Sequence, residues 1–193
     1  TLTVESDIAS ASDKLPADKY YLLACFDLKL DENGCIESYK RIDISEKADN
    51  MKLFAYVKYA VPSTWYNGQT YVDTMSKKAI SDFVDITHNR YKECIGEEFG
   101  KVVPAIFSDE PQMTQKTPLN SPFDKGGCEF PYTTDLDETF KAAYGFSIVD
   151  KLPEIVYDLP DGAVSRPRYL YHEHTSERFA AGFFDTIGEW CQK

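Results

Sequence analysis

The feature that most constrains the fold is residues 102–111, with the sequence VVPAIFSDEP. A short apolar run there ends in two adjacent carboxylates and a proline. β-Branched and aromatic residues dominate the run, so it predicts a buried strand over residues 102–107. Pro111 lacks a backbone donor and ends the strand. Asp109 and Glu110 are therefore expected at the carboxyl end of a strand, where α/β proteins bind ligands.

The residues before this run predict a parallel sheet. Residues 51–60 are apolar on both faces, which is typical of a central strand. Residues 76–99 carry apolar side chains at helical spacing, with Ser76 as N-cap. A strand, a helix and a strand joined by short connections imply a right-handed crossover onto a parallel neighbour. The predicted fold class is therefore α/β.

The remaining elements complete one domain of 193 residues. Asn33-Gly34 predicts a hairpin between strands 20–30 and 35–44. We divide the domain into residues 1–50, which hold this hairpin after a ragged or shortly helical start, and residues 51–193. The second part includes a long loop over residues 111–134. Helices are expected over residues 136–144, 149–157 and 165–190. Because the chain starts at Thr1 and stops within a helical pattern, we expect a piece of a longer protein.

Composition excludes several classes of partner. The net charge of −11 argues against nucleic acid and anionic membranes, which select clustered Lys and Arg. No apolar run is long enough to span a membrane, and the sequence holds no n-region plus h-region of a signal peptide, which a processed or truncated chain would have lost. The five cysteines are scattered and odd in number, which favours reduced thiols over zinc or disulfides. His172 and His174 are two positions apart, which is the wrong spacing for a shared metal on one helix face. We expect no metal and no cofactor.

Glu110 is the first candidate for catalysis, as a general acid/base. Repulsion from Asp109 would favour its protonated form. The alternative is that these acids form a helix cap or a salt-bridged surface pair. If the strands are parallel, the loop after residues 51–60 faces the same cleft. Its aromatic residues would stack on a sugar ring and Asn67 would bind hydroxyls; the alternative is a loop folded over its own apolar cluster. The residues of this loop are Trp65, Tyr66, Asn67 and Tyr71.

Several segments, taken in order, resemble a group of large bacterial glycoside hydrolases. They are residues 65–73 (WYNGQTYVD), 83–91 (FVDITHNRY), 98–101 (EFGK), 107–111 (FSDEP), 144–146, 152–153 and 183–191. The resemblance implies a segment of a (β/α)8 barrel with paired carboxylates, since a whole barrel takes ~250 residues. In the related retaining enzymes the acid/base follows the fourth strand in an Asn-Glu-Pro-like context. Glu110 matches that position, with Asp109 in place of Asn, and no segment matches the second carboxylate.

The predicted function is therefore part of a glycoside hydrolase acting on a carbohydrate substrate. Glu110 would protonate the glycosidic oxygen and then deprotonate water. Asp109 and the residues of the aromatic loop would bind the sugar, with loop 111–134 as a wall or lid. The isolated chain is expected to be inactive for want of the second carboxylate. Two alternatives stay open. One is a non-catalytic carbohydrate-binding module, and the other is an assembly domain whose exposed strand edges cause self-association.

Overall fold

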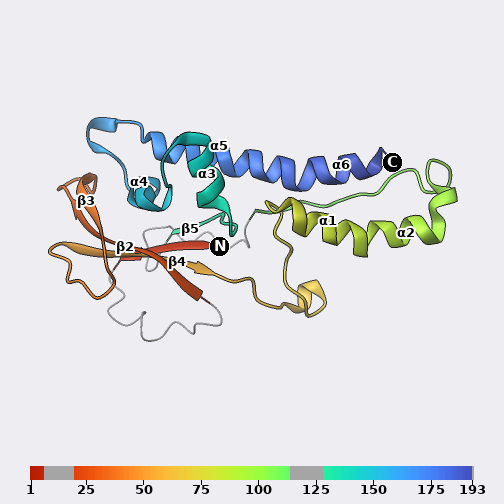
Figure 1. The fold of residues 1–193 in the computed structure, drawn as a ribbon, viewed down its shortest axis with the longest axis horizontal. Coiled ribbons are helices and arrows are strands. Elements are labelled where there is room, and N and C mark those ends of the chain that lie inside the picture. Colours follow the sequence, from red (N-terminus) through yellow and green to blue (C-terminus); the bar gives the residue numbers. More distant parts are fainter. Residues whose placement is uncertain (7–19, 114–127, 193) are drawn as a thin grey trace. The chain divides into compact units, whose positions relative to one another are not determined.

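The computed structural model describes residues 1–6, 20–113 and 128–192 (Figure 1). These form two compact units, which we name the sheet unit and the helical unit. The sheet unit comprises residues 1–70 and 114–174, and the helical unit comprises residues 71–113 and 175–193. Each unit has a hydrophobic cluster of its own.

The sheet unit is built on an open, antiparallel, five-stranded sheet in the order β3-β2-β4-β1-β5. Its central strand is β4, as predicted for residues 51–60. The predicted parallel α/β class, and with it the (β/α)8 barrel segment, is wrong. Every pair of named strands is antiparallel, and the sheet does not close. The strands are β1 (Leu2–Ser6), β2 (Tyr20–Leu30), β3 (Ile36–Ile42), β4 (Met51–Lys58) and β5 (Cys128–Phe130).

The predicted hairpin between β2 and β3 is confirmed. Its turn contains Gly34 at a φ of 80°, a left-handed conformation that glycine adopts without steric cost. The Asp31 carboxylate accepts hydrogen bonds from the amides of Asn33 and Cys35, at 2.9 and 2.8 Å. This carboxylate therefore satisfies two turn donors that would otherwise face only water.

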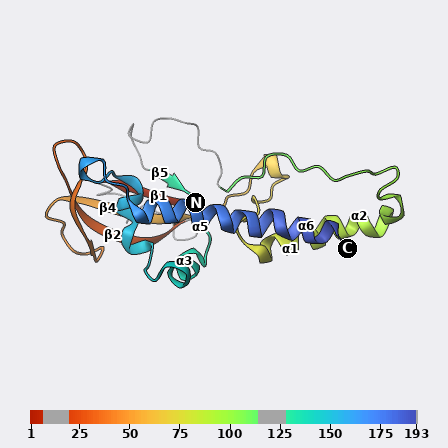
Figure 2. The ribbon, with the colours of Figure 1, turned by 90° about the horizontal axis from the view of Figure 1, so that it is seen from above.

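Helices cover one face of this sheet (Figures 1 and 2). They are α3 (Leu136–Tyr144), a 3₁₀ turn (Val149–Lys151), α4 (Leu152–Val156) and the first part of α5 (Arg166–Phe179). A further 3₁₀ turn spans Pro160–Gly162. The predicted helix over residues 136–144 is confirmed, and it ends at Gly145 with a φ of 83°. The predicted helix 149–157 is observed over residues 149–156, with Pro153 in the first turn of α4, where its missing amide costs nothing.

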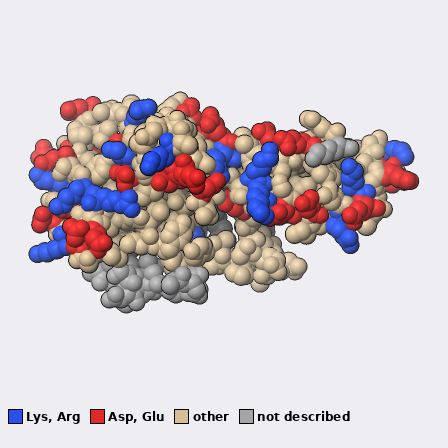
Figure 3. Space-filling model, viewed as in Figure 1, with Lys and Arg blue, Asp and Glu red and all other residues tan. Residues whose placement is uncertain are grey.

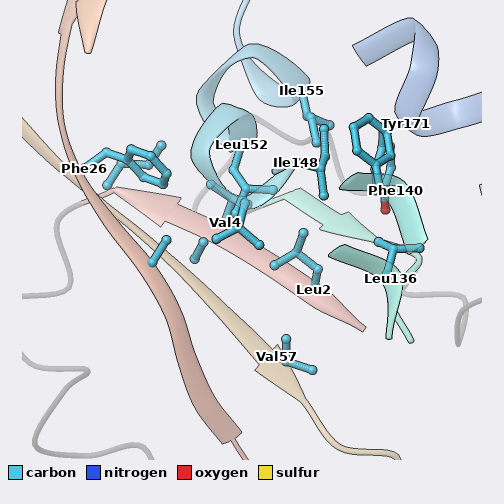
Figure 4. Packing of buried hydrophobic residues seen from close by; sticks show 14 of the residues in the cluster. Leu2, Val4, Phe26, Val57, Leu136, Phe140, Ile148, Leu152, Ile155 and Tyr171 are labelled. Atoms are coloured by element: carbon cyan, nitrogen blue, oxygen red, sulfur yellow. The ribbon is translucent and has the colours of Figure 1, made fainter. Parts of the chain in front are cut away.

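The core lies between that face of the sheet and these helices (Figure 4). Alternate residues of the strands point into it, as the two-residue period of a strand requires. The helices contribute large side chains that water does not reach. Fully buried members include Leu2, Phe26, Leu28, Ala55, Leu136, Phe140 and Tyr171.

The helical unit contains α1 (Lys77–Ile86), α2 (His88–Ile95), a 3₁₀ turn (Gly96–Glu98), a π-helical turn (Ala180–Asp185) and α6 (Thr186–Cys191). The predicted helix 76–99 is interrupted at Thr87, whose hydroxyl donates to the Phe83 carbonyl at 2.6 Å. Such a bond back to the preceding turn bends helices. The predicted N-cap is confirmed, because Ser76 accepts from the Ala79 amide at 3.3 Å. Residues 166–191 are continuously helical, close to the predicted 165–190.

The predicted strand over residues 102–107 is absent. Val103 makes one isolated bridge to Phe99, and residues 104–112 belong to no helix or strand. The side chains are exposed rather than buried, at 77% for Val102 and 84% for Phe107. Pro104 accounts for this, since it removes a ladder donor from the middle of a short run. No strand therefore ends at Glu110.

Two further expectations concern the chain's first residues and its long loop. Residues 2–6 form strand β1, so the predicted ragged or helical start is wrong there. The predicted loop 111–134 includes β5, and its residues 114–127 lie outside the described part of the chain.

Candidate functional site

Asp109 and Glu110 lie on an exposed segment of the helical unit. Glu110 has a φ of 42°, in the left-handed region that non-glycine residues rarely adopt. The residue before a proline is normally extended, because the proline ring crowds its backbone. Such a conformation costs on the order of 1–3 kcal/mol, and backbone strain of this kind is concentrated at functional sites. The surrounding contacts must therefore hold Glu110 in place.

The segment is anchored two residues after Glu110. The amide of Gln112 donates to the Tyr71 hydroxyl at 2.9 Å, and the Gln112 carbonyl accepts from the Thr74 hydroxyl at 2.7 Å. Thr74 is only 2% exposed, so water does not compete for its hydroxyl. The structure thus brings Tyr71, a predicted site residue, into contact with the segment that carries Glu110.

The backbone around Thr74 is itself packed tightly. Gly182, in the π-helical turn, lies so close that a Cβ built on it would be 2.6 Å from the Thr74 carbonyl oxygen. Arg178 donates to the Met75 carbonyl at 3.2 Å. The Asp73 carboxylate accepts from the Met75 amide at 3.1 Å, in the turn that precedes α1.

Trp65 lies on a small closed loop of the sheet unit. Ser63 and Gln69 form an antiparallel bridge across its base, and the Ser63 hydroxyl accepts from the Trp65 amide at 3.2 Å. A 3₁₀ turn (Thr64–Tyr66) occupies the tip, followed by Asn67 at a φ of 55°. Trp65 is 86% exposed. Residues 59–72 carry no charge, and the loop therefore presents a neutral aromatic surface.

The structure divides the predicted site residues between the two units. Trp65, Tyr66 and Asn67 belong to the sheet unit, whereas Tyr71, Asp109 and Glu110 belong to the helical unit. The prediction of one shared cleft relied on two parallel strands ending at one edge. That premise fails because no strand precedes Glu110. Whether these residues act together stays a prediction.

Sequence reasoning missed Thr74 and Gln112. Neither residue type signals a site, and their contact joins positions 38 apart in the chain. The spacing of residues in the sequence does not show whether a threonine hydroxyl is buried or exposed. The one available hint was the position of each residue, because Gln112 directly follows the acidic motif and Thr74 follows the aromatic loop.

Asp27 and His88 are buried ionisable groups that lie outside the candidate site. Burial alone would raise the pKa of Asp27, but bonds from the Asn50 side chain and from the Asp49 and Asn50 amides outweigh it and hold the pKa below its ordinary value. His88 packs edge-on to Phe83 and Trp190, and burial lowers its pKa. Both groups tie elements together and face no candidate substrate site.

Within residues 1–6, 20–113 and 128–192, no three His, Cys, Asp or Glu side chains gather closely enough to hold a metal ion. No helix of the described chain is both long and apolar enough to cross a membrane. On the face shown in Figure 3, basic side chains lie among acidic ones. Several charged side chains of the described residues form ion pairs, as in Arg41 with Asp150 at 2.7 Å.

Comparisons of the chain with protein-family models, with curated protein sequences and with solved structures found no match.

Proposed function

We propose that the chain contributes a proton donor, Glu110, to a glycoside hydrolase. The proposal has two supports. The first is the order of motifs over residues 65–111, which resembles that group of enzymes. The second, which carries the proposal, is the geometry of Glu110. It is an exposed carboxyl group in a strained left-handed conformation, two residues from an anchored Gln112. A surface acid with no role beyond solubility gains nothing from that conformation.

In this reaction Glu110 first acts as an acid. Its carboxyl proton passes to the glycosidic oxygen as the bond from that oxygen to the anomeric carbon breaks, and the leaving alcohol carries the proton away. The Glu110 carboxylate then takes a proton from the water that attacks the anomeric carbon, which restores the acid. Asp109 would accept hydrogen bonds from sugar hydroxyls. For these two steps to balance, a second carboxylate across the sugar must bond to the anomeric carbon as the alcohol leaves and be displaced by the attacking water, and no residue of this chain is assigned to it.

One observation favours a second candidate, carbohydrate binding without catalysis. Trp65 is 86% exposed on a loop braced by its own hydrogen bonds. Sugar rings present apolar C–H faces that stack on such an indole, and a braced loop loses little conformational entropy on binding. This role does not require Glu110.

The natural protein that contains this chain should be assayed against a panel of chromogenic glycosides as wild type and as Glu110→Gln. We expect Glu110→Gln to lower kcat by on the order of 10²–10⁴-fold. The loss should be smaller for an aryl leaving group of low pKa, because such a group departs without being protonated. Glu97→Gln is the matched control, since Glu97 is an exposed acid of the same unit.

The two candidates differ in what each variant removes. Unchanged turnover in Glu110→Gln, with sugar binding lost in Trp65→Ala, would refute the catalytic role and support the binding module. Equal losses in Glu110→Gln for good and poor leaving groups would show that Glu110 does not protonate the leaving group.

A further inference from the structure

We infer that Tyr71 and Thr74 are positioning residues that clamp Gln112 and thereby orient Glu110. The inference rests on the proposed function of Glu110. Tyr71 accepts from the Gln112 amide at 2.9 Å, and Thr74 donates to the Gln112 carbonyl at 2.7 Å. The two bonds hold the peptide groups on both sides of one residue. All three residues belong to the helical unit.

The clamp acts on Glu110 through a short and stiff stretch of backbone. Only Pro111 separates Glu110 from Gln112, and its ring fixes its own φ near −65°. Few backbone torsions therefore remain free between the clamped residue and the carboxyl group. Glu110 itself has a φ of 42°, which an untethered residue before proline would leave for the extended region. The two hydrogen bonds to Gln112 supply the restraint that keeps Glu110 in this conformation.

The clamp has a firm base. Thr74 is 2% exposed, and its backbone packs against Gly182, where no side chain larger than hydrogen fits without displacing the Thr74 carbonyl. Arg178 holds the next carbonyl, that of Met75, at 3.2 Å. Ser76 then caps α1. Because this backbone is packed tightly, the Thr74 hydroxyl has little freedom to move. The hydrogen bond therefore fixes the position of the Gln112 carbonyl rather than that of the hydroxyl.

The first test measures the clamp without any substrate. Amide hydrogen exchange of the 193-residue chain should show faster exchange at Gln112 in Tyr71→Phe, by about two- to tenfold, because the amide loses its acceptor. Thr74→Val should loosen the same amide, whereas Thr74→Ser keeps the hydroxyl and should not. Thr186→Val is the matched control. Thr186 is also buried in the helical unit and donates to a backbone carbonyl, that of Ala181 at 3.4 Å.

The second test measures turnover in the natural protein. We expect Thr74→Val to lower kcat by about 10²-fold with little change in KM, since a misplaced acid reduces rate more than binding. Thr74→Ser should restore most of kcat, and Thr186→Val should lower stability without lowering kcat.

The outcomes separate this inference from the proposed function. Faster exchange at Gln112 with kcat unchanged would refute the positioning role, provided that Glu110→Gln still abolishes turnover. If Glu110→Gln leaves turnover intact, the proposed function itself fails. Equal loss of kcat in Thr74→Val and Thr186→Val would show that general destabilisation, not the clamp, is the cause.

Discussion

The close approach of Gly182 to the Thr74 backbone predicts opposite effects for two alanine substitutions in one continuous helix. A Cβ at position 182 would lie 2.6 Å from the Thr74 carbonyl oxygen and 3.0 Å from the Met75 carbonyl carbon. At position 188 a Cβ would meet nothing within 4 Å. Both substitutions gain the helix propensity of alanine, about 1 kcal/mol relative to glycine. Only Gly182→Ala must also push backbone aside.

The size of that clash can be worked from the distances. An ordinary carbon–oxygen contact is about 0.6 Å or more longer than 2.6 Å, so the π-helical turn and the Thr74 backbone must separate by that much. Forcing one extra methyl group into a packed site costs about 1–3 kcal/mol. Because helix propensity cancels between the two variants, Gly182→Ala should be less stable than Gly188→Ala by that amount. Gly188→Ala itself should be more stable than wild type by about 0.5–1 kcal/mol.

Urea unfolding followed by the fluorescence of Trp190 is the assay. The chain has two tryptophans, and replacing the exposed Trp65 by Phe leaves Trp190 as the sole reporter of the helical unit. Trp190 donates from its indole nitrogen to Asn89 at 2.7 Å, so its emission should change on unfolding. If Gly182→Ala proves as stable as Gly188→Ala, the close approach described for Thr74 is wrong.

Three further predictions concern the two cores and their pH dependence. Phe140 is fully buried, so Phe140→Ala should lower the free energy of unfolding by about 3–5 kcal/mol. A denaturant titration followed by circular dichroism measures this loss. A loss below about 1 kcal/mol would contradict the packing described for Phe140. The pKa of Asp27 is lower in the folded than in the unfolded chain, so its stabilisation is complete above about pH 5 and is lost as the pH falls further. Thermal unfolding should show this loss in wild type and a smaller one in Asp27→Asn. Burial lowers the pKa of His88 in the folded chain, so the helical unit should lose stability as the pH falls below about 6.5, and His88→Gln should flatten that part of the Trp190-detected profile.

Local signals in the sequence predicted the elements that local chemistry determines. Asn33-Gly34 located the β2–β3 hairpin, and Ser76 located the start of α1. Each depends on a turn or cap that a few adjacent residues satisfy among themselves. The same holds for the central place of β4, which follows from its apolar residues on both faces.

Local sequence signals could not predict which strands pair with one another. β1 pairs with both β4 and β5, which are far from it in the chain. The sequence of residues 2–6 contains no signal that predicts these partners. The prediction of a strand over residues 102–107 was wrong. It relied on the apolar residues and neglected Pro104, which removes a backbone donor from the middle of the run. The parallel crossover, and the shared cleft for Trp65 and Glu110, depended on that one strand.

The candidate site also has features that the sequence suggested and features that it did not. Trp65 is exposed, as a stacking residue must be, and its role in sugar binding stays a prediction. The clamp on Gln112 could not be foreseen, since it joins hydroxyl groups and a backbone amide with no distinctive spacing. The motif suggested a role for Glu110, which stays a prediction, whereas the hydrogen bonds of Gln112 depend on the three-dimensional fold.

The exposed stretch before Asp109 also makes the chain vulnerable to digestion. Endoproteases cleave accessible backbone outside regular elements, and residues 104–109 are exposed and belong to no helix or strand. Phe107, 84% exposed, is a preferred residue for enzymes of chymotrypsin specificity. A first cut after it would separate the acidic motif from α1 and α2 along the chain, while the hydrogen bonds of Gln112 would still tie the new end to Tyr71 and Thr74.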